Sequence, residues 1–244
     1  MNHRMLEIFM AVLLIMAVYI TVNSVLPQAS SARETSGKGA FEARVKAKEV
    51  KRTVVLDAGH GGSDSGKISV TGSLEKDLNL LIVQKLKKLL EDADYEVILT
   101  REDTNGLYSE SDKNRKIADM KKRCQIINES SADIVVSVHL NSFTDPKVNG
   151  AQVFYYKHSA QGKVLAGCIQ ESFKNVLNPD NSRVEKYNDS YYMLLNTKPP
   201  TVIAECGFLS NADEAALIDT EEYRDKIAAA LFQGIENYYQ KGQM

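Results

Sequence analysis

The sequence of 244 residues is poor in several residue types, and each shortage excludes a class of protein. It has three cysteines and no Cys-x-x-Cys pair, which is too few for a disulfide scaffold and lacks the spacing of a structural zinc ribbon. Lys and Arg number 30 against 32 Asp and Glu, so the net charge of −2 lacks the basic excess of a dedicated nucleic-acid-binding protein. Histidine is also rare, with four residues, and the position of each is therefore informative.

Two segments at the start of the chain are set apart by their composition. Residues Ile8–Ile20 form an unbroken apolar run, which is shorter than the roughly 20 residues of a bilayer span and close to a signal-peptide core. Small residues at positions 29–32 follow it and suit cleavage by a signal peptidase. We therefore expect residues 1–29 to be a cleaved signal peptide or a retained membrane anchor. Residues 30–52 are polar, which indicates a flexible spacer.

The remainder, residues 53–240, alternates short apolar runs with amphipathic segments. The runs are rich in β-branched residues and are bounded by turns, which is typical of buried strands. Such alternation predicts one α/β domain whose sheet is covered by helices on both faces, and it leaves the strand order open. The expected strands are 53–56, 96–100, 134–138, 151–156 and 201–204, and the expected helices are 78–90, 117–127, 164–176 and two more at the end of the chain.

Polar side chains follow three of these strands. The first strand runs into Asp57–Gly62, which contains His60, the central one runs into His139–Ser142, and the last ends at Glu205. In open α/β sheets, ligands bind beyond the carboxyl ends of the strands, so these residues are expected to meet at one edge. Two imidazoles and a carboxylate are the usual ligands of a catalytic zinc, with a fourth position open. The sequence therefore predicts a metal site that includes His60 and His139.

The third ligand should be an acidic residue near the first of these loops. Glu75 lies at the start of the following helix, with Ser73 as its N-cap, and a negative side chain there also stabilises the helix dipole. Asp64 and Asp77 are equally suited by spacing, so the residues alone leave all three open. Glu205 follows the apolar residues of a buried strand, where an unpaired carboxylate is costly. We expect it to meet a cation or to take part in catalysis.

Four motifs in this order resemble the zinc-dependent N-acetylmuramoyl-L-alanine amidases, which are bacterial cell-wall hydrolases. They extend over about residues 53–239 and are Asp57–Gly62, Glu75, Ser137–Ser142 and Glu205–Asn211. The resemblance implies a Rossmann-like fold with a mixed, mostly parallel sheet. It implies one Zn²⁺ ion held by His60, Glu75 and His139. It also implies that Glu205 is the catalytic carboxylate and that the substrate is the amide bond between N-acetylmuramic acid and L-alanine in peptidoglycan.

The short form of the sequence, with an export segment and no wall-binding module, is most similar to germination-specific members of this family in spore-forming bacteria. This likeness implies work on the spore cortex, outside the cytoplasm and between the membranes of the developing spore. Some relatives insert an autoinhibitory helix before the second histidine, and the stretch from Thr100 to His139 is too short for one. Control would then come from a separate activating protein or from restricted expression.

Two further polar residues, Asn141 and Arg123, are candidates for substrate binding, although a strand-end amide and a helical arginine are more often structural. Arg123 belongs to the Arg-x-x-x-Ala-Asn pattern of many relatives, with Ile127 in place of the alanine. Tyr191 and Tyr192 can line a glycan groove or, beside an apolar run, belong to the core. The sequence leaves both interpretations of these tyrosines open.

Two other functions fit part of the sequence. Cys206 follows Glu205 directly and, with His139 as its base, would form a nucleophile of the kind used by cell-wall cysteine peptidases. Nothing near Cys206 in the sequence would activate its thiol, and a small, buried apolar role suits it better. The second alternative is a non-catalytic, membrane-tethered module that binds peptidoglycan or a protein.

Overall fold

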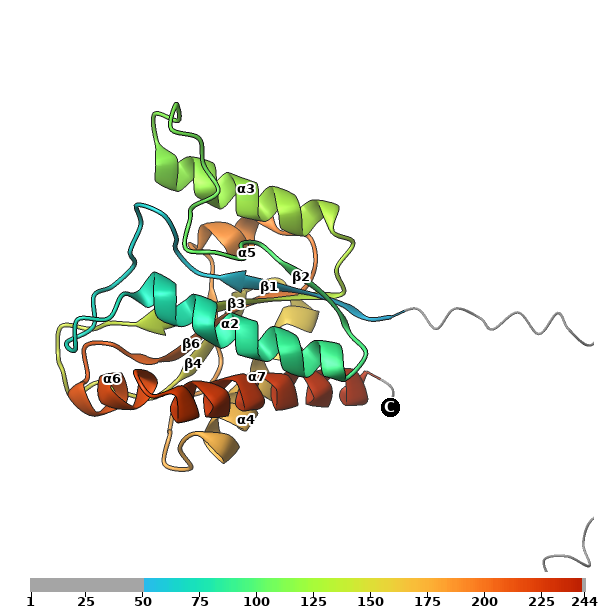
Figure 1. The fold of residues 1–244 in the computed structure, drawn as a ribbon. Coiled ribbons are helices and arrows are strands. Elements are labelled where there is room, and N and C mark those ends of the chain that lie inside the picture. Colours follow the sequence, from blue (N-terminus) through green and yellow to red (C-terminus); the bar gives the residue numbers. More distant parts are fainter. Residues whose placement is uncertain (1–50, 243–244) are drawn as a thin grey trace, which may run out of the picture. The chain divides into compact units, whose positions relative to one another are not determined.

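Apolar runs of the sequence form five of the six strands of one sheet (Figure 1). The computed structural model describes residues 51–242, and its strands are β1 (Thr53–Ala58), β2 (Glu96–Leu99), β3 (Ile134–Asn141), β4 (Gln152–Tyr156), β5 (Lys186–Asn188) and β6 (Thr201–Phe208). Their order is β2-β1-β3-β6-β4-β5. Strand β4 runs antiparallel to β6, and every other neighbouring pair is parallel. The prediction of a mixed, mostly parallel sheet is confirmed.

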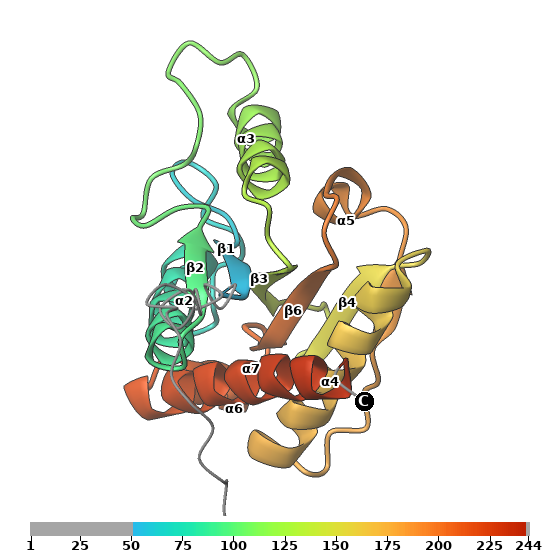
Figure 2. The same ribbon diagram turned by 90° about the vertical axis from the view of Figure 1, so that its right-hand side faces the viewer.

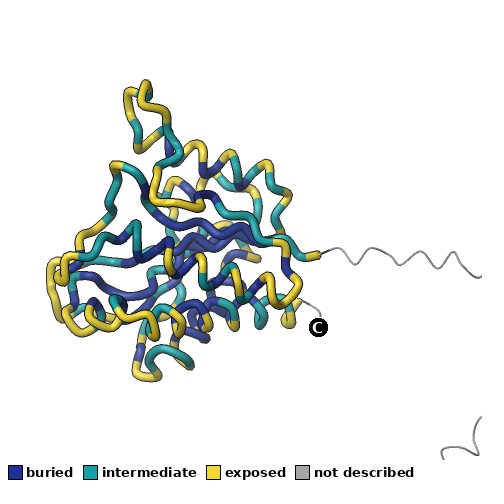
Figure 3. Tube along the Cα trace, in the orientation of Figure 1, coloured by how far each residue is buried: buried dark blue, intermediate teal, exposed yellow. Residues whose placement is uncertain are grey.

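Helices cover both faces of the sheet, as predicted (Figure 2). One face carries α2 (Glu75–Asp92), α4 (Ala160–Val176), α6 (Ala212–Ile218) and α7 (Glu221–Lys241), and the other carries α3 (Arg115–Glu129) and α5 (Tyr192–Asn196). Successive residues of a strand point to opposite faces. Strand β1 therefore places Val54 and Leu56 in the larger core under α2 and α7, and Val55 in the smaller core under α3. Buried residues concentrate in the sheet and along the inner sides of these helices (Figure 3).

Three details differ from the expectation. Strand β5 and helix α5 are three and five residues long, too short to show a period in the sequence. Strands β3 and β6 continue to Asn141 and Phe208, because their polar ends still pair across the sheet. The N-cap prediction was wrong by one position: α2 begins at Glu75 after Leu74, and no side chain caps it.

The expected export segment, residues 1–29, and all but the last two residues of the expected spacer lie outside the described residues. Among residues 51–242, no helix combines the length and apolarity needed to cross a bilayer.

Candidate metal centre and active site

Two side chains on neighbouring strands form the base of the site. His139 of β3 and Glu205 of β6 are partners in the register of these parallel strands, so they lie side by side near the carboxyl ends of both. They alternate along their strands with Val138 and Ala204, which belong to the larger core. Both side chains therefore point to the opposite face, which α3 and α5 cover. The strand ends meet at one edge, as the sequence predicted.

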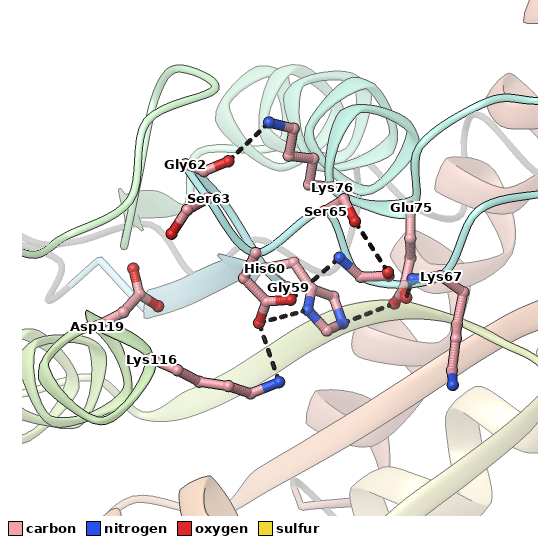
Figure 4. Close-up of polar contacts among 12 residues, drawn as sticks. Gly59, His60, Gly62, Ser63, Ser65, Lys67, Glu75, Lys76, Lys116 and Asp119 are labelled. Carbon is pink, nitrogen blue, oxygen red and sulfur yellow. Dashed lines mark hydrogen bonds and ion pairs between the residues drawn. The ribbon is translucent and has the colours of Figure 1, made fainter. Parts of the chain in front are cut away.

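His60 and Glu75 complete a cluster around one point (Figure 4). His60 lies two residues beyond β1, and Glu75 is the first residue of α2. Oε1 of Glu75 is 3.1 Å from Nε2 of His60 and 3.1 Å from Nδ1 of His139, and the ring centroids of the two histidines are 5.0 Å apart. One ligand atom from each residue lies within 4.8 Å of the others. The three residues are thus placed to hold a single metal ion.

Glu75 is kept anionic although it is only 2% exposed. The backbone N–H groups of Lys67 and Leu140 donate to its two oxygens at 2.8 and 3.2 Å. Burial alone would raise the pKa of Glu75, but its contacts with His139 and His60 lower that pKa well below its usual range. A buried anion between two imidazoles is a strong attractor for a cation.

The other two acids considered as ligands lie elsewhere. Asp77 is outside the cluster, and Asp64 lies behind His60. Oδ2 of Asp64 is 3.0 Å from Nδ1 of His60 and 3.1 Å from Nζ of Lys116. A carboxylate at Nδ1 keeps the imidazole proton there and leaves Nε2, which faces Glu75, free for a metal. Of the three acids that spacing left open as metal ligands, the structure therefore brings only Glu75 into the cluster.

The Gly-rich loop after β1 is shaped by the ligands around it. A Cβ on Gly59 would lie 2.2 Å from Cε1 of His139, and a Cβ on Gly66 would lie 2.5 Å from Oε2 of Glu75. Glycine is therefore required at both places for the chain to approach so closely. His60 itself has a φ of 63°, a left-handed conformation that is uncommon for a residue with a side chain. Backbone strain of this kind persists where surrounding contacts hold it, and it clusters at functional sites.

Arg123, a candidate for substrate binding, lies beneath the site, where its side chain is 1% exposed. Its guanidinium group donates to the carboxylates of Asp57 and Asp119. It also donates to the backbone carbonyls of Ala58 and His60. Because these groups take four of its five N–H donors, the placement of Arg123 favours holding the His60 loop over direct contact with a substrate.

Asp57 had no predicted role, and the structure places it at the centre of a buried polar cluster. It accepts hydrogen bonds from Thr100 at 2.5 Å and Ser137 at 2.6 Å, and it pairs with Arg123 at 2.7 Å. Burial would raise the pKa of Asp57, but the Arg123 charge and these two hydroxyl groups lower it to about 2. The available signal in the sequence was a carboxylate at the end of an apolar strand, which needs a buried cation.

Two cavities border the metal cluster: His60 and His139 line both, and Glu75 lines the smaller one. The larger, of about 540 Å³, has an apolar and aromatic wall that includes Met120, Met193, Tyr191 and Tyr192. The smaller, of about 320 Å³, is more polar and includes Lys67, Ser142 and Asn141. Of the two interpretations of Tyr191 and Tyr192, the structure supports a place in the wall of the site, and Tyr192 is 41% exposed. Asn141 lines this smaller cavity together with His60, Glu75 and His139, and its role in substrate binding stays a prediction.

The alternative of Cys206 as a nucleophile is wrong. Cys206 is the strand neighbour of Glu205, so its side chain points to the opposite face of the sheet, into the larger core. It is 1% exposed, and burial raises the pKa of its thiol well above the usual value. A thiol in this position cannot reach His139 or a substrate.

Comparison with known proteins agrees with this arrangement. The sequence model described as N-acetylmuramoyl-L-alanine amidase matches residues 54–237, which is nearly all of the described domain. This chain belongs to that family. The resemblance carried by the four motifs is confirmed.

Relatives match the chain over about the same region. The germination-specific N-acetylmuramoyl-L-alanine amidase of Bacillus subtilis (strain 168) is 37% identical over 192 residues, covering 77% of this chain and 80% of the relative. The CwlD amidase from Clostridioides difficile, solved in complex with the GerS lipoprotein, is 42% identical with a TM-score of 0.76, covering 78% of this chain and 100% of that one. N-acetylmuramoyl-L-alanine amidase AmiC2 of Nostoc punctiforme is 28% identical with a TM-score of 0.68, covering 78% and 97%.

Proposed function

We propose that this protein is a zinc-dependent amidase that hydrolyses the amide bond between N-acetylmuramic acid and L-alanine in peptidoglycan. The observation that carries the proposal is the convergence of His60, Glu75 and His139 on one point, with Glu205 next to His139 on the neighbouring strand. Membership of the amidase family supports the same activity.

The donor set fits zinc. It offers two imidazole nitrogens and one carboxylate oxygen, whereas magnesium and calcium take oxygen ligands almost exclusively. The contact between Asp64 and His60 is the kind of carboxylate–histidine pair that orients a metal-binding imidazole. When bound, zinc supplies a Lewis acid for activating water and polarising the amide carbonyl.

We assign the proton transfers of the reaction to Glu205. Burial raises its pKa to about 7, and among the described residues its Oε2 is enclosed without a hydrogen-bond partner. This pKa refers to the metal-free protein, and a bound cation would favour the ionised form. The ionised carboxylate can accept the proton of the attacking water and then give it to the nitrogen of L-alanine. The second transfer is essential, because an amide nitrogen leaves poorly unless it is protonated.

We extend the proposal to the setting of the reaction. The relative from Bacillus subtilis is named germination-specific, and the Clostridioides difficile amidase was solved with a lipoprotein. We propose that this chain acts outside the cytoplasm on the spore cortex, between the membranes of the developing spore, and that a protein partner activates it. Residues 1–29 would carry it there, as a signal peptide or as a membrane anchor.

The proposed activity is tested by mass spectrometry of muropeptides after incubation with the zinc-loaded protein. We expect release of peptides that begin with L-alanine, together with glycan that keeps an intact lactyl carboxylate. A chelator should abolish this release, and alkylation of thiols should leave it unchanged. If peptidoglycan bound to the zinc-loaded protein but no peptide were released, the non-catalytic binding module would be the better description.

A further inference from the structure

One buried guanidinium joins the two segments that carry His60 and Glu75. Arg101 follows β2 and is 3% exposed. Its Nη2 donates to the carbonyl of Gly59 at 3.1 Å and to the carbonyl of Lys76 at 2.7 Å. Gly59 directly precedes His60, and Lys76 directly follows Glu75. A single nitrogen therefore ties together the backbone beside both residues.

The other donors of Arg101 also bind backbone carbonyls. Nε donates to Ala58 at 2.9 Å and Nη1 donates to Asp103 at 2.7 Å. Burial lowers the pKa of Arg101 to about 10, so the group stays charged at neutral pH. All four of its hydrogen bonds within residues 51–242 go to carbonyls, and a buried cation without a hydrogen-bonded carboxylate is costly to the fold. Because the buried charge is costly, we attribute these hydrogen bonds to the positioning of the backbone beside His60 and Glu75.

The side chain of Asn79 also bridges the His60 loop and the first turn of α2, but at longer distances. Nδ2 of Asn79 lies 3.3 Å from the carbonyl oxygen of Gly59 and 3.4 Å from Oε1 of Glu75. Both distances are near the limit for a hydrogen bond, so Arg101 makes the shorter and stronger connection.

We propose that Arg101 is a positioning residue for the metal centre. It holds the His60 loop and the first turn of α2 at the separation that lets His60 and Glu75 bind one ion. This inference rests on the proposed zinc site. The planar guanidinium fork can bind four carbonyls in fixed directions at once, whereas the ammonium group of lysine acts as a point charge with freely rotating donors.

The variant Arg101→Lys tests the proposal, because it keeps the charge and most of the side-chain length but loses the fork. Zinc affinity of the full chain is measured by competition with a chromogenic chelator. The melting temperature is measured with and without zinc. We expect zinc affinity to fall about 10–100-fold, as it does when other outer partners of metal ligands are changed. The zinc-induced rise in melting temperature should shrink accordingly.

The rise in melting temperature on adding zinc is the measurement that distinguishes a positioning residue from one that only supports the fold. A residue that only supports the fold lowers the melting temperature of both forms and leaves the rise unchanged. Arg224→Lys is the matched control, because Arg224 of α7 donates to the carbonyl of Ile218, the last residue of α6, at 2.8 Å. This control should keep its zinc affinity.

Two results would overturn the inference. One is a folded Arg101→Lys protein whose zinc affinity stays within about threefold of the unsubstituted protein, with an unchanged zinc-induced rise. The other is failure of Arg101→Lys to fold, which would assign the residue to the fold as a whole. If the unsubstituted protein itself binds no zinc, the proposed metal centre fails and this inference fails with it. That outcome is distinct from equal binding by both proteins.

Discussion

At the scale of single residues, Glu205 stands out because its pKa is raised and one of its carboxylate oxygens is enclosed without a hydrogen-bond partner among the described residues. It is adjacent to the metal cluster, but the group of residues able to hold the metal does not include it. We expect Glu205→Gln to keep one zinc per chain and to lose about 10²–10⁴-fold in turnover, because the amide cannot carry the proton. Elemental analysis and muropeptide release measure the two properties. Glu221→Gln, an exposed acid paired with Lys85, is the control that should retain activity.

The pKa of Glu205 also predicts how the stability of the metal-free protein depends on pH. Its folded pKa of about 7 lies above the unfolded value of 4.5, so the folded state binds the proton more tightly. The stability contributed by the protonated form is complete below pH 4.5 and is lost as the pH rises through about 7. The full loss is about 3 kcal/mol.

Glu205→Gln removes this titration, because glutamine stays neutral. Denaturant unfolding of the metal-free proteins should therefore show the variant gaining stability relative to the unsubstituted chain between pH 5 and pH 8. Saturating zinc should remove the gain, because a nearby cation favours the ionised carboxylate. A difference that is independent of pH in the metal-free proteins would contradict the assigned pKa.

At the scale of elements, the segment from the end of β1 to the first turn of α2 carries two of the proposed metal ligands, His60 and Glu75, and its glycines let the chain pack closely around them. Gly66 has a φ of +68°, and a Cβ there would lie 2.5 Å from Oε2 of Glu75 and 2.7 Å from Cδ2 of His60. We expect Gly66→Ala to weaken zinc binding at least about tenfold, because the new methyl group pushes these residues apart. Chelator competition measures the affinity.

The same loop supplies the control. Gly72 also has a positive φ, of +95°, but a Cβ there meets nothing within 4 Å. Gly72→Ala should cost about 1 kcal/mol in stability through backbone strain and should leave zinc affinity unchanged. Equal losses of zinc affinity in the two variants would show that strain alone is responsible, and that the contact with Glu75 is irrelevant.

The elements also show what the sequence can predict. Long periodic segments such as α2 and the runs in β1 and β3 were predicted, because burial on one or both faces imposes a pattern. The three-residue β5 and the five-residue α5 were not, since they are stabilised by neighbours rather than by their own period. His60 and His139 could be derived from the ends of strands. The choice of Glu75 over Asp64 could not, because it depends on how the loop folds back.

At the scale of the whole molecule, the buried cluster around Asp57 joins the sheet to α3 and supports the site from below. Arg123 of α3 connects Asp57 of β1 to the His60 carbonyl, and Ser137 of β3 donates to the same carboxylate. The parallel register of β1 and β3 places Asp57 opposite Ser137. Stability of the fold and geometry of the metal centre therefore depend on one ion pair.

Asp57→Asn should accordingly destabilise the protein by about 3–5 kcal/mol at pH 7, because it removes one of the two carboxylates that balance the buried Arg123 charge and leaves only Asp119. The folded pKa of Asp57, about 2, lies below the unfolded value of 3.8. The stability that ionised Asp57 contributes is present above pH 3.8 and is lost as the pH falls through about 2. The difference in free energy of unfolding between the unsubstituted protein and Asp57→Asn should therefore narrow by about 2 kcal/mol on going from pH 5 to pH 2.

Urea unfolding across this pH range measures the gap, and Asp225→Asn is the control. Asp225 pairs with Lys85 at 2.7 Å but its side chain is 58% exposed, so its loss should cost less than about 1 kcal/mol. The asymmetry follows from burial: Lys85 is partly open to water and keeps Glu221 as a partner, whereas Arg123 is 1% exposed and water cannot take the place of the Asp57 charge. If Asp57→Asn were no more harmful than Asp225→Asn, the buried ion pair would not be what joins the sheet, α3 and the His60 loop into one cooperative structure.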